Sequence, residues 1–369
     1  MKIYALLVLI AISVTYLLTP VIRRFAIKTG AISSLRKRDI HTRPTPRLGG
    51  AAVLSGFLFT MVVAYQFSFL RPVFEMDNQL IHICIGAVLI CLVGALDDYF
   101  DLDWLLKLAL QIGVAAYVSW QGVRILTLPI AGLTVTSVRT SFVLTVLIIV
   151  AVMNAINFID GLDGLSAGIV AIAAGSFFVY CYLLSSAMTT YASAGALISA
   201  ILCGSCIGFL PHNFYPARIF IGDSGSMLLG YFMACSAIIV TGRIAPGATL
   251  FRSLPVFMPI LLPFLVLLFP AVDMVMSIFR RLIHGHSPFQ PDQMHIHHRM
   301  MLIGHSQVWA VTVLYLWSLL VGAGSVMMLI FDAQYVLFAL GIALVLMLLV
   351  TFGPLIVGHF RKKAHENQH

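Results

Sequence analysis

The chain has 369 residues, of which 60% are hydrophobic and only 10% are charged, and its mean hydropathy is +1.01. Soluble domains carry about 25% charged residues, so this composition excludes a globular enzyme with a single anchor and indicates a polytopic membrane protein. The formal net charge of +8 is compatible with basic loops that face anionic lipid headgroups or an anionic substrate.

Eleven apolar stretches approach the ~20 residues that a helix needs to cross the hydrocarbon core of a bilayer. Because lipid offers no partner to the backbone groups of an open sheet, we predict an all-α polytopic membrane protein. The expected spans are 3–22, 48–69, 80–96, 104–120, 141–156, 164–184, 190–210, 224–241, 256–279, 308–331 and 334–357. The first is expected to be retained, since no small-residue cleavage site follows it.

Basic residues predict how these spans are oriented. The first connection, 23–47, carries eight Lys and Arg residues, which places it in the cytoplasm and the N-terminus outside. With eleven spans the tail 358–369 is also cytoplasmic, and it carries three basic residues of its own. The connection 121–140 is then an external loop or hairpin, and 280–307 is a cytoplasmic loop. The whole chain, 1–369, is expected to form one integral membrane domain.

The acidic clusters and the His-rich run all fall on connections predicted to be cytoplasmic, whereas the external connections hold only three acidic residues. The stretch Asn154–Asp163 lies between two apolar runs, where charged side chains are rarely kept without a use. Asp160 and Asp163 stand three residues apart and would share one face of a helical turn. Capping the next helix needs only one of them, so we expect a functional site at the cytoplasmic face that includes Asn157.

Five carboxylates from three of these connections would repel one another unless a cation or buried protons offset their charge. They are Asp97, Asp98, Asp160, Asp163 and Asp223. Oxygen ligands without thiolates suit Mg²⁺ or Mn²⁺, and Mg²⁺ takes one or two protein carboxylates and completes its shell with water and phosphate. Lys107 follows Asp98 by about two helical turns and could hold a phosphate oxygen. Asp223 also suits an ordinary helix N-cap.

A second polar cluster precedes the tenth span. It consists of Arg281, His295, His297, His298 and Arg299. These residues lack the His pair and glutamate of a zinc metalloprotease helix and contain no thiolate, so contact with a phosphate or nucleotide is expected rather than zinc. The six cysteines lie in or beside apolar runs and are expected to pack without forming disulfides.

Four motifs, in order along the chain, resemble those of the polyprenyl-phosphate N-acetylhexosamine-1-phosphate transferases, glycosyltransferase family 4. They are Leu96–Asp98 with Lys107 and Gln111, Asn154–Gly164, Phe220–Ser226 and His295–His298. The turn Pro46–Gly50 is similar to the turn before the second helix of that family. Ile296 interrupts the run of histidines. This interruption and the run Arg280–Asp292 before it are similar to the corresponding motifs of the WecA-type branch. Shorter stretches are similar to actinobacterial members.

The resemblance implies transfer of GlcNAc-1-phosphate from UDP-GlcNAc to undecaprenyl or decaprenyl phosphate, with release of UMP, at the plasma (inner) membrane. It implies Asp98 and Asp223 as ligands of Mg²⁺, and Asp97, Asp98 and Lys107 as catalytic residues. The implied substrate-binding residues are Asn157, Asp160, Asp163, Arg281, His295, His297, His298 and Arg299. The sequence leaves open whether an aspartyl-phosphate intermediate forms at Asp97–Asp98. Direct attack is favoured, because a phosphomonoester is mostly a dianion at neutral pH and needs no strong base.

Other donors, namely UDP-MurNAc-pentapeptide or UDP-GalNAc, are the nearer alternatives. A secondary transporter is the alternative from another class, but it would place ionisable residues near the bilayer midplane in two related halves, and no repeat is visible here. The expected partners are UDP-GlcNAc, a polyprenyl phosphate and membrane lipids, with no nucleic acid. Members of the resembling family are often dimers, so a homodimer is an open expectation.

Overall fold

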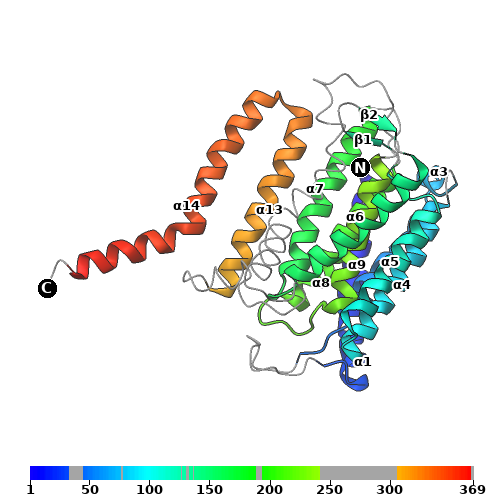
Figure 1. Ribbon diagram of the computed structural model, residues 1–369, viewed down its shortest axis with the longest axis horizontal. Helices are drawn as coiled ribbons and strands as arrows, with labels where there is room; N and C mark the ends of the chain where they lie inside the picture. The colour runs from blue at the N-terminus through cyan, green and yellow to red at the C-terminus, as the bar shows by residue number, and fades with distance from the viewer. Residues whose placement is uncertain are drawn as a thin grey trace.

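The computed structural model describes residues 1–32, 45–75, 78–125, 127–129, 133–135, 137–187, 193–241 and 306–366. The helices in these ranges are α1 (Lys2–Thr29), α2 (Gly49–Tyr65), α3 (Arg71–Glu75), α4 (Gln79–Phe100), α5 (Trp104–Trp120), α6 (Val138–Ile159), α7 (Leu165–Ala187), α8 (Ala194–Asn213), α9 (Gly222–Thr241), α13 (Gln307–Ile330) and α14 (Ala333–Glu366). The same ranges contain two short strands, β1 (Thr127–Pro129) and β2 (Leu133–Val135). Most of the helices run side by side in one bundle (Figure 1).

Among the described residues, eight helices are long and apolar enough to cross a membrane, namely α1, α4, α6, α7, α8, α9, α13 and α14. Helices α2 and α5 are apolar but shorter, with 17 residues each. Every predicted span except 256–279, which lies outside the described residues, overlaps one of these ten helices. The chain is therefore an all-helical polytopic membrane protein, as its composition predicts.

Two helices, α1 and α14, continue well beyond the ends predicted for their spans. Helix α1 runs on to Thr29, where Gly30 with a φ of 80° ends it, and α14 runs on to Glu366. In both cases the apolar pattern stops first, but the Arg, Lys, Ala and Glu residues that follow are good helix formers. The end of the apolar pattern therefore does not mark the end of the helix.

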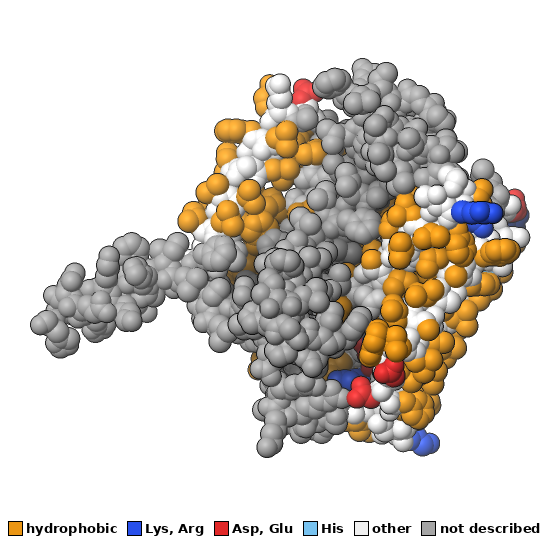
Figure 2. Space-filling view, in the orientation of Figure 1, with side chains coloured by type: hydrophobic (Ala, Val, Ile, Leu, Met, Phe, Trp, Pro, Cys, Tyr) orange, Lys and Arg blue, Asp and Glu red, His pale blue; other side chains and the backbone are white. Residues whose placement is uncertain are grey.

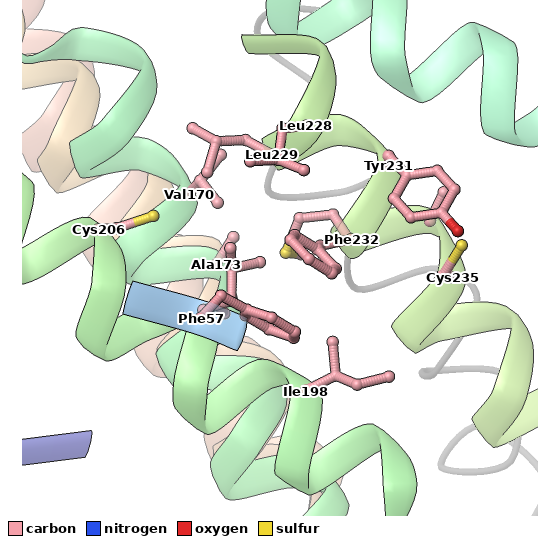
Figure 3. Packing of buried hydrophobic residues seen from close by; sticks show 14 of the residues in the cluster. Phe57, Val170, Ala173, Ile198, Cys206, Leu228, Leu229, Tyr231, Phe232 and Cys235 are labelled. Atoms are coloured by element: carbon pink, nitrogen blue, oxygen red, sulfur yellow. The ribbon is translucent and has the colours of Figure 1, made fainter. Parts of the chain in front are cut away.

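Helix α9 is the central helix of the bundle, and α2, α4, α6, α7 and α8 all pack against it. Figure 3 shows the packing of its buried face, where the ring of Phe232 stacks on Phe57 of α2 with centroids 3.9 Å apart. Neighbours cover α9 on every side, and beyond its first turn, residues 222–226, its buried residues are apolar except for Ser236, whose hydroxyl donates to the carbonyl of Met233. The polar first turn therefore lies among neighbouring helices at one end of the bundle.

Two glycines let the first turn of α9 approach its neighbours closely. A Cβ on Gly94 of α4 would collide with the backbone of Ser224, and a Cβ on Gly50 of α2 would collide with the backbone of Gly225. Any larger side chain at either position would push α9 outward. The backbone of α9 is thus wedged between α2 and α4 at its N-terminal end.

The surface of the bundle carries a broad hydrophobic face. Figure 2 shows hydrophobic side chains covering α4 and α5, with charged side chains near the two ends of these helices. The exposed hydrophobic residues on these two helices include Ile81, Ile85, Leu89, Leu92, Leu96, Leu105, Leu106 and Ile112. Such a surface is a liability in water, whereas in a bilayer it faces lipid.

Strands β1 and β2 pair antiparallel between α5 and α6, with Thr127 opposite Val135. This hairpin lies within the connection 121–140, which the sequence expects to be a loop or hairpin outside the cell. Helix α6 starts beside it, and the opposite end of α6 lies at the C-terminal end of α4 and the first turn of α9. The bundle therefore has a hairpin end and a polar end.

Candidate active site

A pocket of about 310 Å³ lies at the polar end of the bundle, where α4 and α6 end and α9 begins. Five of the side chains that the sequence singles out line it, namely Asp98, Asn157, Asp160, Asp163 and Asp223. They come from three connections that are far apart in the sequence. The folding of the bundle therefore brings together the residues that the motifs predicted to act together.

Lys107 bridges two carboxylates at the edge of this pocket. Its Nζ lies 2.6 Å from Oδ2 of Asp97 and 3.1 Å from Oδ2 of Asp223. The other oxygen of Asp97 accepts a hydrogen bond of 2.9 Å from the backbone N–H of Leu102. Asp97 thus faces Lys107, whereas its neighbour Asp98 lines the pocket. In this structure the charge of Lys107 offsets two carboxylates. Binding of a phosphate oxygen by Lys107 stays a prediction.

Asp98 caps helix α9 from outside that helix. Its Oδ1 accepts from the backbone N–H of Asp223 at 3.0 Å, and its Oδ2 accepts from that of Ser224 at 3.1 Å. A carboxylate is favoured there by the free N–H groups and by the helix dipole. Gly222 has a φ of 69° and a Cβ there would lie 2.5 Å from Asp98 Oδ2, so only glycine suits this turn. Asp98 thereby fixes the position of the Asp223 backbone.

Asn157 orients the side chain of Asp223. Its Nδ2 donates to Oδ1 of Asp223 and, at 2.8 Å, to the hydroxyl of Ser226. One turn earlier in α6, Asn154 donates to the buried Gln111 at 2.7 Å. With both N–H donors of Asn157 used, its Oδ1 is the atom suited to meet a ligand, and an amide oxygen can accept from a sugar amide or bind a hard cation.

Asp160 is half-buried at the C-terminal end of α6 and accepts a hydrogen bond of 2.6 Å from the hydroxyl of Ser166. The pKa of Asp160 is raised to about 7, chiefly because the carboxyl group is buried. The hydrogen bond from Ser166 and the positive charge of Arg47 lower this pKa, and the negative charges of Asp223 and Asp98 raise it. One carboxyl of the pocket therefore holds its proton near neutrality, mainly because it is buried and secondarily because other carboxylates lie near it.

The loop from Asp160 to Gly164 is tied to two other parts of the chain. Oδ2 of Asp163 accepts from the backbone N–H of Ala217 at 2.9 Å. The N–H of Gly164 donates to Oδ1 of Asn213 at 3.1 Å, and its carbonyl accepts from the hydroxyl of Tyr315 on α13. These bonds hold the acidic loop against α13 on one hand and against the end of α8 and the connection after it on the other.

Two polar side chains that line the pocket were not predicted as site residues. Arg47 enters from the turn before α2, and the buried Asn213 enters from the end of α8. The sequence suggested only a topological role for the Arg47 charge, although the Pro-Arg-Leu-Gly-Gly turn already resembled a motif of the family. No local pattern marks Asn213, because its partners are Gly164 and the carbonyl of Ile219.

Three further sequence predictions concern the second polar cluster, the metal site and the cysteines. Arg281, His295, His297, His298 and Arg299 all lie outside the described residues. Within the described ranges, no three His, Cys, Asp or Glu side chains are placed to hold a metal ion by themselves. All six cysteines are free thiols at buried or half-buried positions.

The fold and this pocket define a membrane-embedded protein with an acidic, oxygen-rich site at one end of a helical bundle, suited to phosphate chemistry with a hard cation. Residues 80–241 match the family model described as Glycosyl transferase family 4. The chain is 38% identical over 361 residues to the decaprenyl-phosphate N-acetylglucosaminephosphotransferase of Mycolicibacterium smegmatis, covering 95% of this chain and 88% of the relative.

Two further relatives agree with this match. The Mycobacterium tuberculosis decaprenyl-phosphate N-acetylglucosaminephosphotransferase is 36% identical over 337 residues, covering 89% of this chain and 83% of that protein. A probable undecaprenyl-phosphate N-acetylglucosaminyl 1-phosphate transferase of Bacillus subtilis is 30% identical over 310 residues, covering 84% of this chain and 80% of that protein. The chain therefore belongs to glycosyl transferase family 4, and the predicted resemblance, including its actinobacterial character, is confirmed.

Proposed function

We propose that this protein transfers GlcNAc-1-phosphate from UDP-GlcNAc to a polyprenyl phosphate and releases UMP. An oxygen of the lipid phosphate attacks the β-phosphorus of the donor, a new P–O bond forms, and the P–O bond to UMP breaks. The observation that carries the proposal is the single pocket shared by the side chains of three separate motifs. The activities named for relatives that cover most of the chain support the same reaction.

Phosphoryl transfer leaves little covalent work to a protein, so positioning and charge stabilisation dominate. The acidic pocket would repel a diphosphate unless a cation came with it. Asp223 and Asp98 offer only oxygen ligands and lie close together, which fits Mg²⁺ or Mn²⁺ with one or two protein carboxylates and the remaining ligands from phosphate and water. When bound, such a cation would offset the negative charge that develops on UMP.

Hydrogen bonds and ion pairs within the protein fix the positions of the first turn of α9 and of the Asp223 carboxylate. Asp98 holds the first turn of α9, and Asn157 and Lys107 hold the two oxygens of the Asp223 carboxylate. The acceptor phosphate is mostly a dianion at neutral pH, so direct attack needs no strong general base. We therefore favour Asp97 as a partner of Lys107 over Asp97 as a nucleophile.

The donor site is proposed to include Asp160 and Asp163 as well as the polar residues before α13. Those residues are Arg281, His295, His297, His298 and Arg299. Arginine and histidine side chains suit the diphosphate and the GlcNAc hydroxyl groups. The names of the relatives support GlcNAc as the sugar over MurNAc-pentapeptide or GalNAc.

We further propose eleven spans, an N-terminus outside the cell, and a pocket that opens to the cytoplasm at the plasma membrane. The basic end of α1, with Arg23, Arg24 and Lys28, supports this orientation, because basic residues stay on the cytoplasmic side. That end contacts the polar end of the bundle, since Nε of Arg23 donates to the carbonyl of Arg218 at 2.8 Å.

A panel of donors tests the proposal. Purified protein would be incubated with Mg²⁺, a polyprenyl phosphate and one UDP-sugar at a time, and UMP would be measured with and without EDTA. UMP that forms with UDP-GlcNAc and disappears with EDTA supports both reaction and cation. UMP formed from UDP-MurNAc-pentapeptide instead would contradict the donor. No UMP with any donor from well-folded protein would return the transporter to consideration.

A further inference from the structure

The charges that line the pocket raise the question of which side chain binds the phosphate groups of the substrates. Its described lining holds four carboxylates and a single cationic side chain, that of Arg47. The substrates of the proposed reaction add phosphate groups to this negative site. Lys107, the cation that the sequence offered for a phosphate, is not among the lining residues, and its Nζ lies 2.6 Å and 3.1 Å from two carboxylates. Among the described cations, Arg47 is therefore the one that lines the pocket.

The backbone around Arg47 is fixed on both sides. The N–H of Arg47 donates to the carbonyl of Ala31 just beyond the end of α1, at 2.9 Å. The carbonyl of Pro46 accepts from the N–H of Phe220 at 2.9 Å, and the N–H groups of Gly49 and Gly50 donate to the carbonyls of residues 220 and 221 at 3.0 Å and 2.9 Å. The turn is thereby attached to the same segment that leads into Asp223.

The next residue, Leu48, has a φ of 101°, which is a rare conformation for a residue with a branched side chain. Such a conformation persists only where the surroundings over-determine it, and it is often found at binding sites. Leu48 is buried against Ala26 and Ala31, while its backbone turns sharply into α2. This turn fixes the backbone of Arg47 beside the carboxylates of the pocket.

We propose that Arg47 binds a phosphoryl group of the substrates, either the diphosphate of the nucleotide sugar or the phosphate of the lipid acceptor. This inference rests on the proposed function and adds a residue to it. The guanidinium presents its donors in a planar fork that matches two phosphate oxygens, which an ammonium cannot do. In this arrangement the carboxylates hold the cation and Arg47 holds the phosphate.

Substituted enzymes with a matched control test the inference. Arg47→Gln removes the charge, Arg47→Lys keeps it without the fork, and Arg24→Gln removes an exposed arginine at the same end of α1, away from the pocket lining. The assays are KM for UDP-GlcNAc at saturating lipid, KM for the lipid at saturating donor, and Kd for UDP by calorimetry. A charge-assisted bond to phosphate predicts roughly a tenfold to hundredfold loss in Arg47→Gln, with a smaller loss in Arg47→Lys and none in Arg24→Gln.

The three measurements distinguish the diphosphate of the donor from the phosphate of the lipid as the group that Arg47 binds. If Arg47 holds the diphosphate, KM for UDP-GlcNAc and Kd for UDP both rise while KM for the lipid is unchanged. If it holds the lipid phosphate, only KM for the lipid rises. Unchanged KM and Kd values in both Arg47 variants would overturn the inference, as would equal losses in Arg24→Gln. Wild-type protein that releases no UMP would instead refute the proposed function itself.

Discussion

Removing the positive charge of Lys107 is the most informative single change in this site. In Lys107→Met the aliphatic part of the side chain stays, but Asp97 and Asp223 lose their shared cation. The side chains of Lys107 and Asp97 are only 16% and 7% exposed, and that of Asp223 is 30% exposed, so water compensates little for the loss. We expect the variant to be less stable and to release far less UMP.

The size of the effect follows from the two contacts. At an effective dielectric constant of about 20, charges at 2.6 Å and 3.1 Å attract by about 6 and about 5 kcal/mol, before the cost of taking them out of water is subtracted. Removal of one partner from a buried pair typically costs about 3–5 kcal/mol, because the other charge stays buried. At about 2 °C per kcal/mol, Tm would fall by roughly 6–10 °C.

Thermal unfolding of the purified protein in detergent measures this shift beside the rate of UMP release. The double variant Asp97→Asn/Lys107→Met removes one of the two uncompensated carboxylates and should regain about half of the lost Tm. Lys28→Met, at an exposed position at the end of α1, should shift Tm by at most about 2 °C. If Lys107→Met lost activity at an unchanged Tm, Lys107 would act on the substrate and not on the carboxylates.

Three further changes probe the pocket separately. Asp223→Asn should lower UMP release at least about a hundredfold, because it weakens the proposed cation site, with circular dichroism unchanged; near-normal Mg²⁺-dependent turnover would contradict that site. Tyr315→Phe loses the bond to the Gly164 carbonyl and should lower kcat about tenfold, whereas Tyr231→Phe, which loses a comparable bond to a backbone carbonyl elsewhere, should not; equal kcat values would contradict this. Burial raises the pKa of Asp160 to about 7, so between about pH 4 and pH 7 the ligand-free folded state binds a proton that the unfolded state does not. The folded state therefore loses stability as the pH rises through that window. Asp160→Asn removes this loss and should raise Tm more at pH 8 than at pH 5. A Tm difference independent of pH would contradict the raised pKa.

The positions of the helices were readable from the sequence because hydropathy reports burial in a bilayer directly. The gathering of the acidic motifs at one end was also readable, since each motif ends or begins a span and alternate connections share a side. The roles within a motif were not readable. Asp97 and Asp98 are adjacent in the sequence but about 100° apart around α4, so one faces Lys107 and the other faces α9.

Contacts between distant segments account for the rest. Asn213 and Tyr315 both bind the backbone of Gly164, 49 and 151 residues away in the sequence. Neither residue belongs to a pattern of charge or spacing, so packing alone reveals them. Arg47 was hidden differently, because eight basic residues in one connection are fully explained by membrane topology. Its position in the Pro46–Gly50 turn was the one hint in the sequence, and its place beside the carboxylates separates it from the other basic residues.

The mass of the lipid product tests the central claim most directly. Wild-type protein, UDP-GlcNAc, Mg²⁺ and a polyprenyl phosphate would be incubated together, and the extracted lipid would be analysed by mass spectrometry. A lipid that gains one GlcNAc and one phosphate, matched by UMP in the aqueous phase, is the predicted result. A lipid that gains GlcNAc alone, matched by UDP, would show that the sugar C–O bond breaks instead, and would contradict transfer of the phosphoryl group.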